Sequence, residues 1–128
     1  MAMEELIEAA KHERWKFVDS HAPQAAKNDA NVVWAYTCGL KDSDGNVRDL
    51  AATLLVKARL SKQELQGAIP VLRRVMSKDS NPYARYRAAF ALAEHGNKSQ
   101  SVINVLREAT NDKDVADEAR KYLQKLSI

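Results

Sequence analysis

One arrangement of apolar residues occurs three times along this chain of 128 residues. In each copy a small or β-branched residue is followed four positions later by an alanine, and four positions after that by a leucine. The copies are Val47, Ala51 and Leu55, then Ala84, Ala88 and Leu92, then Val115, Ala119 and Leu123. Apolar residues four positions apart lie on one face of a helix, and alanine there lets a neighbouring helix approach closely. Because one such helix cannot bury that face alone, the repetition predicts a stack of similar helical units.

A further run of apolar residues at helical spacing precedes each copy, so each unit is expected to be a pair of helices. The expected pairs cover about 30–58, 62–95 and 99–126. Upstream, residues 3–18 predict one more helix, followed by a broken stretch around Pro23. The expected fold over 1–128 is a single all-α domain of about seven helices. It is a short right-handed α-solenoid (alpha-alpha superhelix) of about three helix pairs plus an N-terminal helix.

Helix-boundary signals agree with this division. Ser61 with Glu64 three residues later predicts a capping box, and Pro82 fits the first turn of a helix capped by Asn81 or Ser80. Gly96 stands where a left-handed carboxyl-terminal cap is expected. The remaining expected caps and turns are Asp44 with Gly45, Ser99 or Asn97, and Asp112 or Asp114.

Pro70 lies inside the helix expected from about 62 to 77, where it removes a hydrogen bond and is expected to bend the helix. With Pro70, the second unit shows Ala68, Ile69, Leu72, Asp79, Arg85, Ala88, Ala89, Leu92 and Gly96. In these residues the chain resembles the HEAT repeats, specifically the short variety first noted in phycobilisome lyases. The first unit matches through Asp44, Val47, Arg48, Ala51, Ala52 and Leu55, and the third has Ala116 where the arginine is expected. The resemblance covers about 30–126, and it implies that the arginine reaches an aspartate in a neighbouring turn and ties successive units together.

Positive charge is concentrated in the middle of the chain. Residues 45–98 hold ten basic and four acidic side chains, a net charge of +6, whereas the whole chain carries +3. We expect some of these cations to form a basic partner-binding surface. The candidates are Arg48, Arg59, Arg73, Arg74, Arg85 and Arg87.

No catalytic, cofactor-binding or metal-binding residues are expected. His12, His21 and His95 lie in different elements without the spacing of metal ligands, and Cys38 is expected to be a small packed residue. No phosphate-binding glycine loop or nucleophile elbow is present. The chain is therefore not expected to be an enzyme.

The single cysteine excludes an internal disulfide, and no stretch reaches the length of a membrane-spanning helix. A cytoplasmic protein without a membrane partner is the simplest expectation. Its expected function is that of a protein-interaction or scaffold module, which presents the inner surface of the solenoid to a macromolecular partner. The alternatives are nucleic-acid binding through the central basic surface, and a regulatory or lyase-like subunit of an enzyme.

Overall fold

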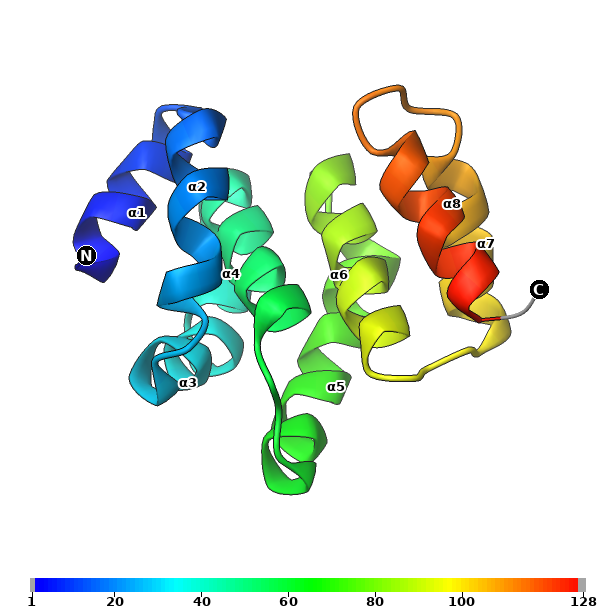
Figure 1. Ribbon diagram of the computed structural model, residues 1–128, viewed down its shortest axis with the longest axis horizontal. Helices are drawn as coiled ribbons and strands as arrows, with labels where there is room; N and C mark the ends of the chain where they lie inside the picture. The colour runs from blue at the N-terminus through cyan, green and yellow to red at the C-terminus, as the bar shows by residue number, and fades with distance from the viewer. Residues whose placement is uncertain (1, 127–128) are drawn as a thin grey trace.

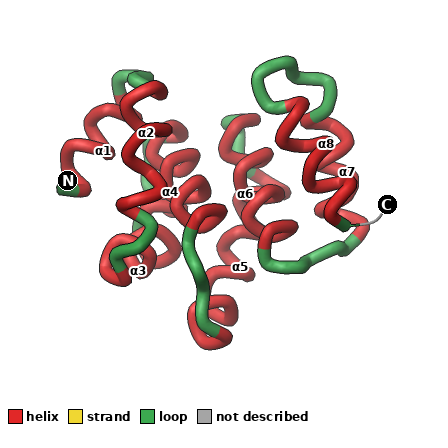
Figure 2. Tube along the Cα trace, in the orientation of Figure 1, coloured by secondary structure: helices red, strands yellow, loops and turns green. Residues whose placement is uncertain are grey.

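The computed structural model describes residues 2–126, which fold into eight α-helices and one short 3-10 helix. The helices are α1 (Met3–Lys11), α2 (Trp15–Ala25), α3 (Asp29–Thr37), η1 (Gly39–Lys41), α4 (Gly45–Lys57), α5 (Lys62–Lys78), α6 (Pro82–Glu94), α7 (Gln100–Ala109) and α8 (Ala116–Lys125). Within residues 2–126 there is no strand, and Figure 2 shows only helices and loops. The all-α prediction is confirmed.

The helices form antiparallel pairs that stack side by side, from α1 with α2 to α7 with α8 (Figure 1). The second helices of the pairs, α2, α4, α6 and α8, line up across the molecule and all run in the same direction. The first helices form the other layer. The predicted short helical solenoid is thus the observed architecture.

The apolar columns seen in the sequence form the seam between units. Ala51, Ala88 and Ala119 have no exposed surface, and Leu55 and Leu92 are buried, as expected for packing positions. Leu123, in the last helix, is only partly buried. Helices α4 and α6 are packed against each other and lie in the middle of the stack, and therefore bury residues nearly all around.

Most of the expected helix boundaries are observed. Ser61 and Glu64 form the capping box, with Glu64 N–H donating to Ser61 Oγ at 3.1 Å and Ser61 N–H to Glu64 Oε1 at 2.9 Å. Asp44 and Asn81 cap α4 and α6 through their side-chain oxygens. Gly96 has φ 88°, which a glycine adopts readily, and closes α6 as the sequence indicates. Pro70 lies inside α5.

The single helix expected over 3–18 is wrong, because the chain turns at Glu13 and forms a helix pair instead. Glu13 has φ 60°, its N–H donates to the Ala10 carbonyl at 3.0 Å, and Arg14 N–H donates to the Ala9 carbonyl at 2.9 Å. These bonds satisfy carbonyls that a helix end leaves unpaired, as glycine caps usually do. A glutamate in this conformation gives no sequence signal, so the start of α2 was expected to continue the helix over 3–18 and the rest of α2 to lie in a broken stretch.

Three smaller expectations also differ. Pro23 lies inside α2 rather than in a break. Helix α8 begins after Val115, and neither Asp112 nor Asp114 caps it. Cys38 is exposed at the end of α3 rather than packed, because it follows the last turn of that helix.

Candidate functional site

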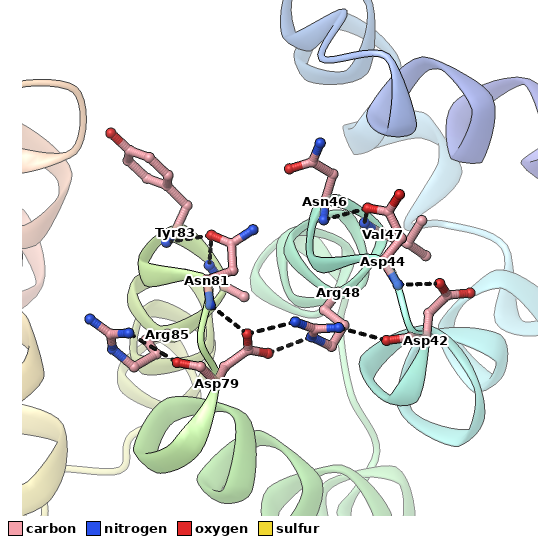
Figure 3. A network of polar contacts seen from close by, with 10 residues as sticks. Asp42, Asp44, Asn46, Val47, Arg48, Asp79, Asn81, Tyr83 and Arg85 are labelled. Atoms are coloured by element: carbon pink, nitrogen blue, oxygen red, sulfur yellow. Dashed lines mark hydrogen bonds and ion pairs between the residues drawn. The ribbon is translucent and has the colours of Figure 1, made fainter.

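A buried ion pair beside the turns between units joins the α3–α4 pair to the α5–α6 pair. Arg48, near the start of α4, donates from Nε to Asp79 Oδ2 at 2.6 Å and from Nη2 to Asp79 Oδ1 at 2.9 Å (Figure 3). Its third donor, Nη1, reaches the Asp42 carbonyl at 2.8 Å. The Asp79 side chain is only 3% exposed. This confirms the tie that the family resemblance implies.

The electrostatics of the pair follow from its geometry. Burial alone would raise the pKa of Asp79, but hydrogen bonds from Arg48 and from the Asn81 N–H outweigh it, and the pKa of this carboxyl is lowered. The hydrogen bond to Asp79 in turn raises the pKa of Arg48. Both groups are therefore held in their charged forms.

The next unit does not repeat this pair. Arg85 keeps the carbonyl contact, to Asp79 at 2.9 Å, but its side chain reaches Glu108 at 3.2 Å. Tyr83 instead donates its hydroxyl to Asp112, at 2.9 Å. That hydrogen bond, together with burial and the charges of Asp112 and Asp114, raises the pKa of Tyr83 to about 12.

The sequence comparison matched Asp44 of the first unit with Asp79 of the second, and this match is wrong. In the three turns, Asp42, Asp79 and Asp112 are equivalent, because each accepts the backbone N–H two residues on at 2.8–2.9 Å. Asp44 is instead the cap of α4, so its equivalent in the next unit is Asn81, the cap of α6. A spacing of six residues to Arg48 and to Arg85 marks the correct aspartate, and would have identified it.

A second polar network lies on the inner layer. Arg87 on α6 donates from Nε to Asp49 on α4 and from Nη1 to Glu118 on α8, both at 3.2 Å. Asp49 is 4% exposed and also contacts the Thr53 hydroxyl at 3.5 Å. Burial raises the pKa of Asp49, and the charge of Arg87 counteracts this only partly. One guanidinium thus connects the last three of the four helix pairs.

Replacing the buried carboxylate gives a prediction with a defined pH dependence. Asp49→Asn is expected to stabilise the fold at pH 7 by on the order of 1 kcal/mol, because it removes a buried charge while Arg87 keeps Glu118. The pKa of Asp49 is higher in the folded state than the unfolded value of about 4. The charge of Asp49 therefore lowers the free energy of unfolding above the folded-state pKa, and has no effect below the unfolded value. Urea unfolding at pH 7 and at pH 3.5 should show the gain only at pH 7.

The control is Asp117→Asn, which removes an aspartate with a side chain 99% exposed. It should leave the free energy of unfolding nearly unchanged at both pH values. A loss of stability in Asp49→Asn at pH 7 would show that the charged pair itself is stabilising, and would contradict the prediction.

A third contact joins α6 to α8. Tyr122 stacks on Phe90 at 5.3 Å between ring centroids, and its hydroxyl donates to Glu94 at 2.9 Å. Lys125 reaches the same carboxylate at 2.8 Å. Burial and the hydrogen bond to Glu94 raise the pKa of Tyr122. Although burial opposes it, the bonds from Lys125 and Tyr122 lower the pKa of Glu94.

The second helices form the floor of a groove, here called the inner groove, which crosses the molecule from α2 to α8. At their carboxyl ends lies a hollow of about 660 Å³, the carboxyl-end hollow. It is lined by Pro23, Ala26, Lys27, Asp29, Val56, Lys57, Arg59, Glu94, Glu118, Lys121 and Tyr122. Four cations and three carboxylates line this hollow around a partly apolar floor, so its formal charge is +1.

At the amino ends of the same helices lies a second hollow of about 430 Å³, the amino-end hollow. It is lined by Glu13, Trp15, Asp19, Asn46, Asp49, Tyr83, Arg87, Asp114 and Val115. A smaller hollow of about 290 Å³ between the two shares Lys57 and Glu118 with the first and Asp19 and Asp114 with the second. The inner groove is therefore continuous, with a formal lining charge of +1 at the rim formed by the carboxyl ends of the second helices and −3 at the rim formed by their amino ends.

The structure does not bring the six candidate arginines together. Arg48 and Arg85 lie near the starts of α4 and α6, beside the turns between units, and have acidic partners. Arg87 faces the inner groove but is paired with two carboxylates. Arg73 and Arg74 are exposed on α5, in the outer layer.

Only Arg59 of the six lines the carboxyl-end hollow. The cations around it, Lys27, Lys57 and Lys121, come from α2, α4 and α8 and the turns beside them. Two of them lie outside the basic middle of the sequence, so a count along the chain could not find them. All three lie in the second half of a second helix or just after it, and this shared position is the signal that could have identified them.

Two further findings concern classes of site. Among residues 2–126, no three His, Cys, Asp or Glu side chains are placed to hold a metal ion. None of the described helices is both long enough and apolar enough to cross a membrane.

Comparison with known proteins gives one match. A family model described as HEAT repeats matches residues 37–126, from the end of α3 through α8. Comparison with curated proteins and with solved structures finds no match.

Proposed function

Because the chain belongs to the HEAT-repeat family, we propose that it is a non-catalytic scaffold module whose inner groove holds a segment of a partner protein. Members of this family generally mediate protein interactions. The observation that carries the proposal is the inner groove itself, which is continuous across α2, α4, α6 and α8 and has charged rims around a partly apolar floor. Protein interfaces combine these features.

The mixed charge of the groove favours a protein over a nucleic acid. Phosphates along a nucleic acid would meet the cations of the carboxyl-end hollow, but would be repelled by Glu13, Asp19 and Asp114 at the other end. A protein segment can carry both signs of charge. Nucleic-acid binding is therefore not proposed.

The finer family assignment rests on two residues. Pro70 in the first helix of a pair and Arg48 bound to the aspartate of the following turn are features of the short repeats first noted in phycobilisome lyases. They support placing the chain in that subtype. A lyase-like role is not part of the proposal.

Reversing charge in the carboxyl-end hollow tests the proposed function. The double variant Lys57→Glu with Arg59→Glu should capture at least about tenfold less partner protein from a native cell extract than the original chain, because opposite charges guide docking. Both residues are exposed. Quantitative mass spectrometry of the captured proteins measures the difference.

The matched control is Lys62→Glu with Arg73→Glu, which reverses two exposed cations on α5 outside the inner groove. It should capture the same proteins as the original chain. Equal capture by both double variants would contradict the proposed function. Salt-sensitive binding of DNA or RNA by the original chain would favour the nucleic-acid alternative instead.

A further inference from the structure

The amino-end hollow is a concave pocket lined by several helices rather than a flat patch of surface charge. It has a volume of about 430 Å³ and lies where the amino ends of α2, α4, α6 and α8 come together. Two aromatic residues line it, Trp15 at the start of α2 and Tyr83 at the start of α6. Figure 3 shows Tyr83 and Asn46 extending from the amino ends of α6 and α4, on the side away from Asp79.

The pocket carries an excess of negative charge. Four carboxylates and one guanidinium line it, so its formal charge is −3. The guanidinium, of Arg87, is held between Asp49 and Glu118. Within residues 2–126, Glu13 and Asp19 have no basic side chain within ion-pair distance.

One of the carboxylates that line the pocket is largely buried but keeps one oxygen accessible. Asp49 is 4% exposed, and its hydrogen bonds from Arg87 and Thr53 both go to Oδ1. Across the described residues, Oδ2 accepts no hydrogen bond from a protein group. Because no buried side-chain polar atom among the described residues lacks a partner, Oδ2 retains contact with solvent and is open to a hydrogen bond from a ligand in the pocket.

The neighbouring groups respond to the same negative field. The pKa of Asp49 is raised by burial and further by the charge of Asp19, despite Arg87. The Asp112 and Asp114 carboxylates contribute to the raised pKa of Tyr83. A cation in the pocket would relieve both effects.

We propose that the amino-end hollow binds a basic side chain, best an arginine, of the protein segment that occupies the inner groove. The proposal rests on the proposed function and names one anchor of the partner. Aromatic faces and carboxylates are the two groups that hold a guanidinium, by cation–π contact and by charge-assisted hydrogen bonds. Arginine fits better than lysine because its five N–H donors can reach Asp49, Asp19 and Asp114 from one flat group.

The test uses a short peptide as the probe, acetyl-Gly-Arg-Gly-amide, titrated into the full ¹⁵N-labelled chain. The indole N–H signal of Trp15 reports from inside the pocket, and that of Trp34, which lies beside Gly39, reports from outside it. We expect a saturable shift of the Trp15 signal alone, with a dissociation constant on the order of millimolar. The same peptide with citrulline, the neutral isostere of arginine, should produce no saturable shift.

Variants assign the shift to the carboxylates. Asp19→Asn with Asp114→Asn should weaken binding of the arginine peptide at least about fivefold, since two charges are lost. Glu4→Gln with Asp117→Asn removes two exposed carboxylates outside the pocket and should bind as the original chain does. Equal binding of the arginine and citrulline peptides, or equal binding by both double variants, would overturn the proposal.

The same variants separate this proposal from the proposed function. If partner capture falls with Lys57→Glu and Arg59→Glu but not with Asp19→Asn and Asp114→Asn, the groove binds a protein without using the pocket, and only the arginine proposal fails. If neither pair alters capture, the proposed function fails. Loss of capture with both pairs supports the two together.

Discussion

A chain that ends at Lys98 is expected to lose its cooperative fold. Removing α7 and α8 uncovers the face of α6 on which Tyr122 stacks, where Phe90 is completely buried in the intact chain. Exposing a buried aromatic side chain costs about 2–3 kcal/mol, and several apolar neighbours are uncovered with it. Since small domains are stable by only about 5–15 kcal/mol, the remaining units should be molten or insoluble.

Thermal unfolding followed by circular dichroism, with size-exclusion chromatography, measures this outcome. The control is the same shortened chain with Phe90→Lys, because a polar outer face is what a terminal unit requires. That control should be more soluble than the shortened chain without it. A soluble, monomeric and cooperatively melting chain of residues 1–98 would contradict the stacked arrangement.

Arg48→Ala is expected to destabilise the fold by about 3–5 kcal/mol, because it leaves a buried carboxylate without its cation. Asp79 would keep only the Asn81 N–H as a donor. The matched control is Arg85→Ala, the same position one unit later. Its acidic partner Glu108 has a side chain 50% exposed, so the expected loss of that ion pair is about 1 kcal/mol or less.

The pH dependence of the free energy of unfolding should differ in sign between the original chain and Arg48→Ala. The folded-state pKa of Asp79 is lowered, so its contribution is present above the unfolded value of about 4 and is lost as pH falls through the folded value. Without Arg48, burial favours the neutral acid and acidification should stabilise the variant. Chemical unfolding between pH 3 and pH 7 measures both curves. Similar losses for Arg48→Ala and Arg85→Ala at pH 7 would show that burial of the pair is irrelevant.

The stacked helical core could be predicted because its signals are local or periodic. Ala51, Ala88 and Ala119 repeat at fixed places on successive helices, and all are fully buried. Capping residues such as Ser61 act on backbone groups within three positions, so the sequence alone contains both partners. The expected caps of α4 and α6, Asp44 and Asn81, are both observed.

The amino-terminal pair could not be predicted, because its turn depends on a glutamate in a conformation that usually marks a glycine. The tertiary structure must stabilise this backbone, through burial of Leu6 and Ala10 in the same core as α4. With this pair missing, the sequence could not show that α2 forms one side of the groove. Trp15 and Asp19 were therefore absent from the expected site.

The charge of the site could be predicted only as a total. The sequence shows that residues 45–98 are basic, but not where each side chain is directed. Arg48 and Arg87 are bound by carboxylates brought from other units, whereas Lys27 and Lys121 converge from the two ends of the chain. Pairing over such distances depends on the stack itself.

The common direction of α2, α4, α6 and α8 has a further consequence. Each helix has a dipole with its positive end at the amino terminus, and four aligned dipoles reinforce rather than cancel one another. Their positive ends lie at the acidic rim and partly offset its carboxylates, but the two rims still present different side chains. A peptide bound in the groove therefore contacts different side chains in its two possible orientations. The groove is expected to select the direction of the bound peptide as well as its composition.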